Sequence, residues 1–340
     1  MRLINIKSYE IEEFFGEDIP EYAILSHTWG KGEVSFQEWK DLNDSVRAKP
    51  GYRKIMGACQ LARKGGFDWL WVDTICIDKS SSAELTEAIN SMFAWYRDSK
   101  ICYAYLEDVA FTDSWYPEPS LDSFKKSRWF TRGWTLQELL APQKVYFYDR
   151  GWELIGAKEQ ALSGVRCLVF VIAGVTGIGH TFLDGSSTLN NASVAKRLSW
   201  IANRKTTRVE DMAYCLLGIF DINMPLLYGE GMKAFTRLQH EIIKSSSDHT
   251  IFSWTWDDNV PSNWVSMLAP FPSSFANSGK YFRKDAAARL KPYAMTNIGL
   301  SIELPVIYGS SHIFAILNIL NAPSCIPRIP CQTWRLSTSS

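Results

Sequence analysis

The chain has 340 residues and lacks several features that mark common protein classes. Its 36 basic residues balance 36 acidic ones, whereas a nucleic-acid-binding surface usually needs a basic excess. The longest apolar run, Cys167–Val175, is too short to span a bilayer as a helix. The residues after Met1 soon turn acidic and indicate no secretory signal. These absences predict a cytoplasmic protein with no membrane span and no nucleic acid as partner.

Motifs for metals, cofactors and disulfides are also absent. The seven cysteines are scattered without a C-x-x-C pair, which favours reduced thiols over a disulfide framework or a zinc site. There is no Walker loop, and Gly174-x-x-Gly177-x-Gly179 has the wrong spacing for a dinucleotide fingerprint. We therefore expect no metal and no bound cofactor.

Hydrophobic residues are plentiful, and their pattern alternates between strand and helix in the first half of the chain. They make up 46% of the residues, with 14 Trp, 14 Tyr and 18 Phe, which is enough for a substantial core. Short apolar runs predict strands, and 3.6-residue periodicity predicts the helices between them. The expected strands are residues 22–26, 69–73, 101–106 and 144–148, and the expected helices are residues 52–63, 82–96 and 134–140.

This alternation predicts an α/β fold with a parallel sheet and crossover helices. Ligands bind such sheets beyond the carboxyl ends of the strands. Polar residues follow three of the expected strands at these ends, in the segments Ser26–Trp29, Asp73–Thr74 and Glu107–Asp108. We therefore expect a site at this edge.

The second half of the chain has a different pattern. Helices are expected at residues 194–202, 209–220 and 230–246, and strands at residues 251–254, 300–304 and 312–317. The expected divisions are a first domain over residues 1–155, a linker over 156–193, a helical segment over 194–250, a small β-rich region over 251–322, and a disordered tail over 323–340.

One carboxylate, Glu138, stands on the short and otherwise apolar helix at residues 134–140. A buried acid is costly unless it is paired, hydrogen-bonded or used, whereas most glutamates simply face solvent. Arg128, Trp129, Arg132 and Trp134 all precede it closely. Glu138 is therefore the principal candidate for a functional side chain.

Three blocks of sequence resemble, in order, the signature blocks of the fungal heterokaryon-incompatibility (HET) domain. They are Tyr22–Gly30 (YAILSHTWG), Trp71–Asp78 (WVDTICID) and Arg128–Leu139 (RWFTRGWTLQEL). The resemblance covers residues 20–150, and residues 194–254 look like the helical segment that often follows this domain. Residues 164–183 are more apolar and richer in glycine than the family's usual linker.

HET domains are similar in turn to Toll/interleukin-1 receptor (TIR) domains, which have a flavodoxin-like parallel sheet. In plant TIR domains a Trp-Cys-Leu-x-Glu-Leu block carries the glutamate that cleaves NAD. Trp134–Leu139 resembles that block, with Thr135 in place of the cysteine, and Glu138 matches the glutamate. The resemblance thus implies a catalytic role for Glu138, with NAD as substrate.

A single carboxylate suffices for this chemistry. Nicotinamide leaves NAD from a cationic bond and needs no proton, so no general acid is required, unlike in ordinary glycosidases. The carboxylate must hold the ribose and stabilise an oxocarbenium-like transition state. It must therefore be ionised, and we expect Arg132 or Arg128 to keep it so.

Other candidates for substrate binding lie at the strand ends or beside Glu138. They are Ser26, His27, Trp29, Asp73, Asp78, Arg128, Arg132 and Trp134. Each has a structural alternative, because the tryptophans can pack in the core, the aspartates can cap backbone amides, the arginines can be solvated, and the histidine can be a satisfied strand-end residue.

Two classes of function therefore stay open within the HET resemblance. The first is a cell-death effector of self/non-self recognition that cleaves NAD. The second is a non-enzymatic signalling adaptor that acts by self-association, and an inactive family member is a third reading. The resemblance implies homo-oligomers on activation, with other incompatibility or NLR-type signalling proteins as partners. An open cleft beside Glu138, lined by Ser26, His27 and Trp29, would favour the enzyme, and a sealed Glu138 would favour the adaptor.

Overall fold

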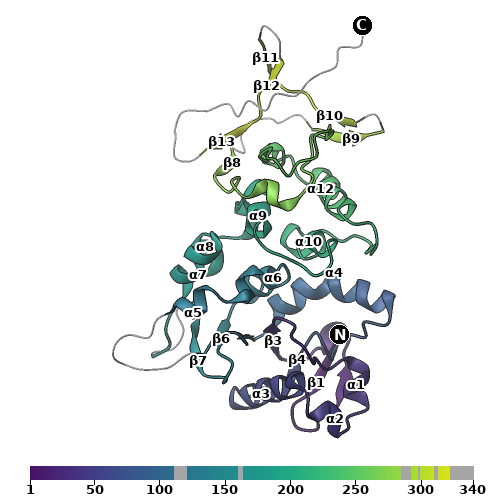
Figure 1. Cartoon of the computed structure of the whole chain (residues 1–340), viewed down its shortest axis with the longest axis vertical. Coiled ribbons are helices and arrows are strands. Elements are labelled where there is room, and N and C mark those ends of the chain that lie inside the picture. The colour runs from purple at the N-terminus through teal and green to yellow at the C-terminus, as the bar shows by residue number, and fades with distance from the viewer. Residues whose placement is uncertain (111–120, 160–163, 285–291, 298, 310–312, 322–340) are drawn as a thin grey trace. The chain divides into compact units, whose positions relative to one another are not determined.

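The computed structural model describes residues 1–110, 121–159, 164–284, 292–297, 299–309 and 313–321 (Figure 1). The tail expected to be disordered, residues 323–340, lies outside the described residues. The chain divides into two compact units. Unit 1 comprises Met1–Ser187, Arg204–Thr206 and Tyr214–Leu226, and unit 2 comprises Thr188–Asn203, Thr207–Ala213 and Leu227–Ser340.

Unit 1 is built on a sheet that has seven strands among the described residues, in the order β2-β1-β4-β3-β5-β6-β7. The strands β4, β3, β5 and β6 are parallel, whereas β2, β1 and β7 pair antiparallel at the two edges. The mostly parallel α/β sheet expected from the sequence is confirmed. The bounds are β1 (Arg2–Asn5), β2 (Ile11–Glu13), β3 (Ala23–His27), β4 (Trp69–Trp71), β5 (Ile101–Tyr105), β6 (Val145–Tyr148) and β7 (Leu154–Ala157).

The order of the parallel strands marks one place on this sheet. The parallel strands follow one another along the chain as β3, β4, β5 and β6. In the sheet they lie in the order β4-β3-β5-β6, which is second, first, third and fourth. This is the flavodoxin-like order, in which the chain reverses direction across the sheet between the first and third strands. The corresponding switch point lies between β3 and β5, and ligands of such folds bind beyond the carboxyl ends there.

Helices cover both faces of the sheet, with α3 on one face and α4 and α6 on the other (Figure 1). The core between them is apolar and includes Ile24, Leu25 and Trp71, all fully buried. The helices and 3-10 turns that join the parallel strands are α1 (Phe36–Lys40), α2 (Asp44–Arg47), α3 (Pro50–Lys64), α4 (Ser82–Asp98), α5 (Asp122–Lys125), η2 (Arg128–Thr131) and α6 (Thr135–Leu140).

The starts of these helices follow local chemistry. Pro50 opens α3, where its missing amide proton costs nothing. Ser81 caps α4, but the carboxylate of Glu84 accepts from the Asp78 amide at 2.7 Å and pairs with Arg2, so no reciprocal capping box closes there. The complete capping box instead opens α1, between Ser35 and Glu38.

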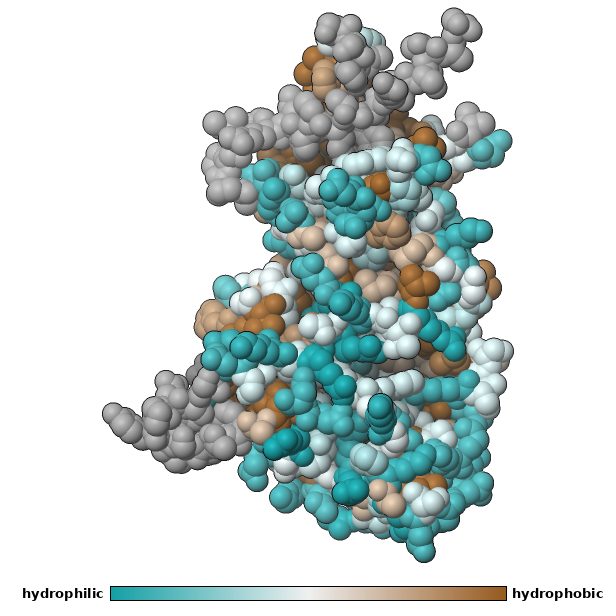
Figure 2. Space-filling view, in the orientation of Figure 1, coloured by the Kyte–Doolittle hydropathy of each residue, from teal (hydrophilic) through white to brown (hydrophobic). Residues whose placement is uncertain are grey.

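Residues 156–193, expected to be a linker, contain two helices of unit 1, α7 (Val169–Thr176) and α8 (His180–Leu183). Gly177 ends α7 in the left-handed conformation, with φ at 70°. The helix is apolar on its outer side as well, since Phe170 is 72% exposed. Figure 2 shows hydrophobic residues gathered on the surface in this region.

Unit 2 combines helices with short antiparallel strand pairs. The helices expected over residues 194–202 and 230–246 are α9 (Val194–Ile201) and α12 (Lys233–Ser245), and the expected helix over 209–220 is divided into α10 (Asp211–Tyr214) and α11 (Leu217–Phe220), of which α11 belongs to unit 1. The strand pairs are β8 (Tyr281–Arg283) with β13 (Ile319–Asn321), β9 (Ala294–Thr296) with β10 (Gly299–Ser301), and β11 (Val306–Tyr308) with β12 (Ile313–Ala315).

The strand predicted at residues 251–254 is wrong. Residues His249–Phe252 form a 3-10 turn, η4, because the Asp248 carboxylate accepts from the Thr250 amide at 2.9 Å and curls the backbone. The Thr250 hydroxyl also accepts from the Ala195 amide at 3.1 Å, which ties the turn to α9. The strands expected at residues 300–304 and 312–317 are present in shorter form, as β10 and β12. Within the described part of the chain, no helix has the length and apolar character needed to cross a membrane.

Candidate functional site

Glu138 lies in the first turn of α6, on the sheet face that α4 and α6 cover, and it is 6% exposed. The Ser26 hydroxyl donates a hydrogen bond to its carboxyl group, and the Trp129 indole donates to the Ser26 oxygen at 2.9 Å. Burial raises the pKa of Glu138 to about 8, because its contacts with Ser26, Tyr96 and Arg204 only partly offset the loss of solvation. The carboxyl group is therefore protonated at neutral pH.

The cation that lowers the pKa of Glu138 is not one of the two expected arginines. The Arg204 guanidinium lowers the pKa of Glu138, whereas Arg128 is exposed and pairs with Glu107. Arg132 is half-buried, and its backbone carbonyl accepts a hydrogen bond from Arg204 at 2.9 Å. The expectation that Arg128 or Arg132 keeps Glu138 ionised is therefore not met in this conformation.

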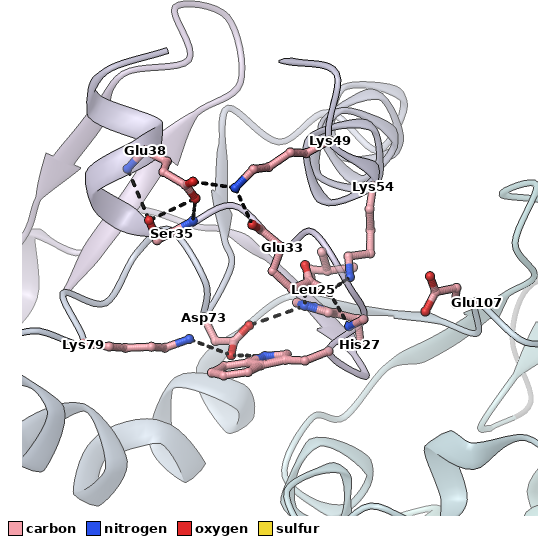
Figure 3. Close-up of polar contacts among 12 residues, drawn as sticks. Leu25, His27, Glu33, Ser35, Glu38, Lys49, Lys54, Asp73, Lys79 and Glu107 are labelled. Atoms are coloured by element: carbon pink, nitrogen blue, oxygen red, sulfur yellow. Dashed lines mark hydrogen bonds and ion pairs between the residues drawn. The ribbon is translucent and has the colours of Figure 1, made fainter. Parts of the chain in front are cut away.

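A second polar cluster lies around His27, at the carboxyl end of β3 (Figure 3). The His27 side chain is 1% exposed, and its Nε2 lies 3.8 Å from both Glu33 Oε2 and Asp73 Oδ1. These separations are too long for hydrogen bonds, and within the described residues His27 Nε2 and Glu33 Oε2 have no hydrogen-bond partner. Burial, followed by the charge of Lys54, lowers the pKa of His27 to about 4, so the imidazole is neutral at pH 7.

Two lysines neutralise the carboxylates of this cluster. Lys54 donates to Glu33 at 2.6 Å, and Lys79 donates to Asp73 at 3.4 Å (Figure 3). Burial tends to raise the pKa of Asp73, but the charges of Lys79 and Lys54 and the hydrogen bond from Trp29 act against it, and the pKa is lowered. Two carboxylates, each paired with a lysine, therefore flank a neutral imidazole.

Trp29 is the exposed part of the cluster. It is 52% exposed, and its indole nitrogen donates to Asp73 at 2.8 Å. The Lys79 ammonium lies 3.7 Å from the centroid of the indole ring, a cation–π contact. The stacking role expected for Trp29 is compatible with this exposure, although Lys79 occupies one position over the ring.

Strand geometry explains why the expected site residues fall into two groups. Ser26 and His27 are neighbours on β3, and successive side chains of a strand point to opposite faces. Ser26 therefore meets Glu138 beneath α6, whereas His27 faces Lys54 of α3. Asp73 follows β4 and its negative charge raises the pKa of both Glu138 and His27. This shared charge links the two groups at the edge of the sheet.

The remaining candidates are Asp78, Arg128 and Trp134. Asp78 accepts from the Ser80 amide at 2.9 Å and from Gln37 at 2.5 Å, which is the capping role weighed as its alternative. The Arg128 amide donates to Asp108 at 2.7 Å, and Trp134 is half-buried at the residue before α6. Their role in substrate binding stays a prediction.

Sequence reasoning missed several members of both groups: Glu33, Lys54, Lys79, Tyr96 and Arg204. Lys54 carried a detectable signal, because it lies one helical turn before Ala58 on the buried stripe of α3, where a lysine is out of place. Glu107 follows β5, and a Cβ added at Gly30 would lie 3.1 Å from its carboxylate. The loop that follows β3 therefore passes close to the Glu107 side chain at the switch point.

Comparison with known proteins bears directly on the class of this chain. Residues 22–116 match the family of heterokaryon incompatibility (HET) proteins. This stretch contains the first two signature blocks, and the match supports a HET domain in this part of the chain. The resemblance to TIR domains, by contrast, stays a prediction.

One relative is identical to this chain at half of the positions that align. The chain is 50% identical over 231 residues to vegetative incompatibility protein HET-E-1 of Podospora anserina, a stretch that is 66% of this chain and 16% of the relative. The chain therefore spans only a small part of the length of that protein. No solved structure gives a significant match.

Proposed function

We propose that this chain acts as a cell-death effector in heterokaryon incompatibility, the fungal recognition of self and non-self. The proposal is supported by the HET match over residues 22–116 and by the 50% identity with a protein named for vegetative incompatibility. Induced expression of the chain in fungal hyphae should reduce viability, and full viability at high expression would contradict the proposal.

The chemistry that we propose for this effector is cleavage of NAD through Glu138. The observation that carries it is the hydrogen bond that Ser26 donates to Glu138. Ser26 is the penultimate residue of β3, so this bond holds Glu138 close to the carboxyl end of the strand at the switch point. A protonated carboxyl group does not stabilise positive charge, so Glu138 must lose its proton and become accessible before it can act. NAD cleavage is therefore assigned to a rearranged, activated state.

Nicotinamide release tests this chemistry directly. The purified chain, fused to a segment that forces oligomerisation, should release nicotinamide from NAD, and Glu138→Gln should reduce the rate by a hundredfold or more. Glu153→Gln is the matched control, because it makes the same change at an exposed glutamate of the same unit. Absence of nicotinamide from the forced oligomer, or equal rates in the two variants, would exclude this chemistry.

Signalling by self-association is the second candidate, and two observations favour it. Glu138 is covered by other side chains, and α7 presents an apolar surface on which Phe170 is 72% exposed (Figure 2). Monomeric proteins seldom leave large apolar patches uncovered, and a second copy of the chain would cover this one.

Two measurements separate self-association from catalysis. Phe170→Asp should weaken self-association in analytical ultracentrifugation at least tenfold, whereas Phe15→Asp, at a residue of the same unit that is 67% exposed, should leave it unchanged. Cell death that survives Glu138→Gln but not Phe170→Asp would identify an adaptor. Loss of cell death with Glu138→Gln in a folded protein would identify an enzyme.

A further inference from the structure

Residues Arg204–Thr206 belong to unit 1 although the chain on both sides of them belongs to unit 2. Residues Thr188–Asn203 precede the segment in unit 2 and residues Thr207–Ala213 follow it there. The segment thus leaves one unit for three residues and then returns. The contacts of this short segment must therefore lie mainly within unit 1.

The segment holds the turn that leads into α6. Lys205 forms a parallel β-bridge with Arg132, in which the Lys205 amide donates to the Thr131 carbonyl at 2.7 Å and the Gly133 amide donates to the Lys205 carbonyl at 2.9 Å. The bridge joins two segments that are far apart in the sequence, since Arg204, the neighbour of Lys205, lies 72 positions after Arg132. It is therefore a tertiary contact and not part of a local turn.

Arg204 adds side-chain hydrogen bonds at the same turn. One guanidinium nitrogen donates to the Arg132 carbonyl at 2.9 Å and to the Thr135 hydroxyl at 3.0 Å. That hydroxyl in turn lies 2.5 Å from the Trp129 carbonyl, to which it donates. Arg204 is 6% exposed, so these bonds are shielded from water and stronger than surface contacts.

These contacts hold the turn that precedes α6. No side chain caps the start of α6 at Trp134, and the bonds of Arg204 and Lys205 fix the residues that lead into the helix. Thr135 and Glu138 are three residues apart and lie on neighbouring positions of the helix surface. Whatever holds Thr135 in place therefore also holds Glu138 against Ser26.

We propose that Arg204–Thr206 is a latch that keeps α6 closed over the sheet, and that its release exposes Glu138. Arg204 is the positioning residue of the latch, since it acts on Glu138 through Thr135 and the turn at residues 131–133. Both ends of the latch continue into unit 2, so a structural change in that unit reaches the Glu138 site through the chain itself. As regulation of catalysis the latch rests on the proposed function, but its existence does not.

Hydrogen exchange of the whole chain, read by mass spectrometry, tests the latch without NAD. Arg204→Ala removes the guanidinium, and Lys205→Pro removes the amide that donates to Thr131 while leaving Arg204 in the chain. Lys205→Ala is the matched control, because it removes an exposed side chain and retains the bridge. The α6 amides should exchange about tenfold faster or more in the first two variants and at the wild-type rate in the third.

Exchange at β5 distinguishes a latch from a general contributor to stability. The β5 amides should keep their protection in all three variants, and Arg204→Lys, which retains a charged donor, should recover part of the protection of α6. Modification of Glu138 by a water-soluble carbodiimide should rise together with exchange at α6. Unchanged exchange at α6 in Arg204→Ala, or an equal loss of protection at α6 and β5, would overturn the proposal.

The effector activity gives a separate readout. At equal expression, Arg204→Ala should kill cells more strongly than the wild-type chain if the latch restrains the proposed activity. If no form of the chain kills cells or releases nicotinamide, the proposed function fails, while the exchange result still decides whether the latch exists.

Discussion

The stability of this protein should fall as pH rises from about 4.5 to about 8 because of one side chain, Glu138. Burial raises the pKa of Glu138 from 4.5 to about 8 in the folded chain. Below pH 4.5 both the folded and unfolded states hold the proton. Between the two pKa values the unfolded state ionises and the folded state does not, so each pH unit lowers the free energy of unfolding by about 1.36 kcal/mol. Above pH 8 the loss is complete.

Glu138→Gln isolates this contribution, because glutamine is close in shape to the protonated acid and does not titrate. The variant should match the wild-type protein near pH 4.5, exceed its free energy of unfolding by roughly 3 kcal/mol at pH 7, and exceed it by roughly 5 kcal/mol above pH 8. All other titrating groups are common to both proteins and cancel in the difference.

Urea unfolding from pH 4.5 to pH 9, followed by hydrogen exchange at β3 and β5, measures the difference in the unit that contains Glu138. A difference that does not change with pH would refute the reasoning. It would mean that Glu138 is ionised in the folded chain, and the resting protein would then hold the charged carboxylate that NAD cleavage requires.

Three further predictions follow from buried groups of unit 1. The His27 imidazole should not titrate between pH 8 and pH 6 in NMR spectra, because its pKa is lowered to about 4 and stability is lost only as pH falls from 6.5 toward that value; a transition near pH 6.5 would contradict its burial. Lys158→Met should lower the free energy of unfolding in urea by about 1–3 kcal/mol, because it leaves two buried carbonyls at the end of α6 without their donor, and an unchanged midpoint would show that water replaces it. Gly218→Ala should lower the melting temperature in calorimetry, at a cost of about 1–3 kcal/mol, because its Cβ would lie 2.0 Å from the Cβ of Phe93; an unaltered melting temperature would mean that α4 and α11 separate freely.

Local sequence was enough to define the parallel strands, the helices between them and the HET signature blocks. The apolar runs at residues 22–26 and 69–73 became β3 and β4, because four or five apolar residues bounded by polar ones fit only a buried strand in an alternating pattern. It also placed polar residues at the carboxyl edge, since strand direction follows from the crossover helices. The antiparallel edge strands β2 and β7 were not predicted, because short edge strands carry little hydrophobic periodicity.

Tertiary structure decided which of the polar residues meet. Glu138 meets Ser26 across a separation of 112 residues, and the alternation of β3 sends the neighbouring His27 to Lys54 on the opposite face. Arg204 reaches the start of α6 only because the chain returns to unit 1 for three residues. No pattern in the sequence encodes such contacts, since they depend on how distant elements pack and not on the order of residues within any one of them.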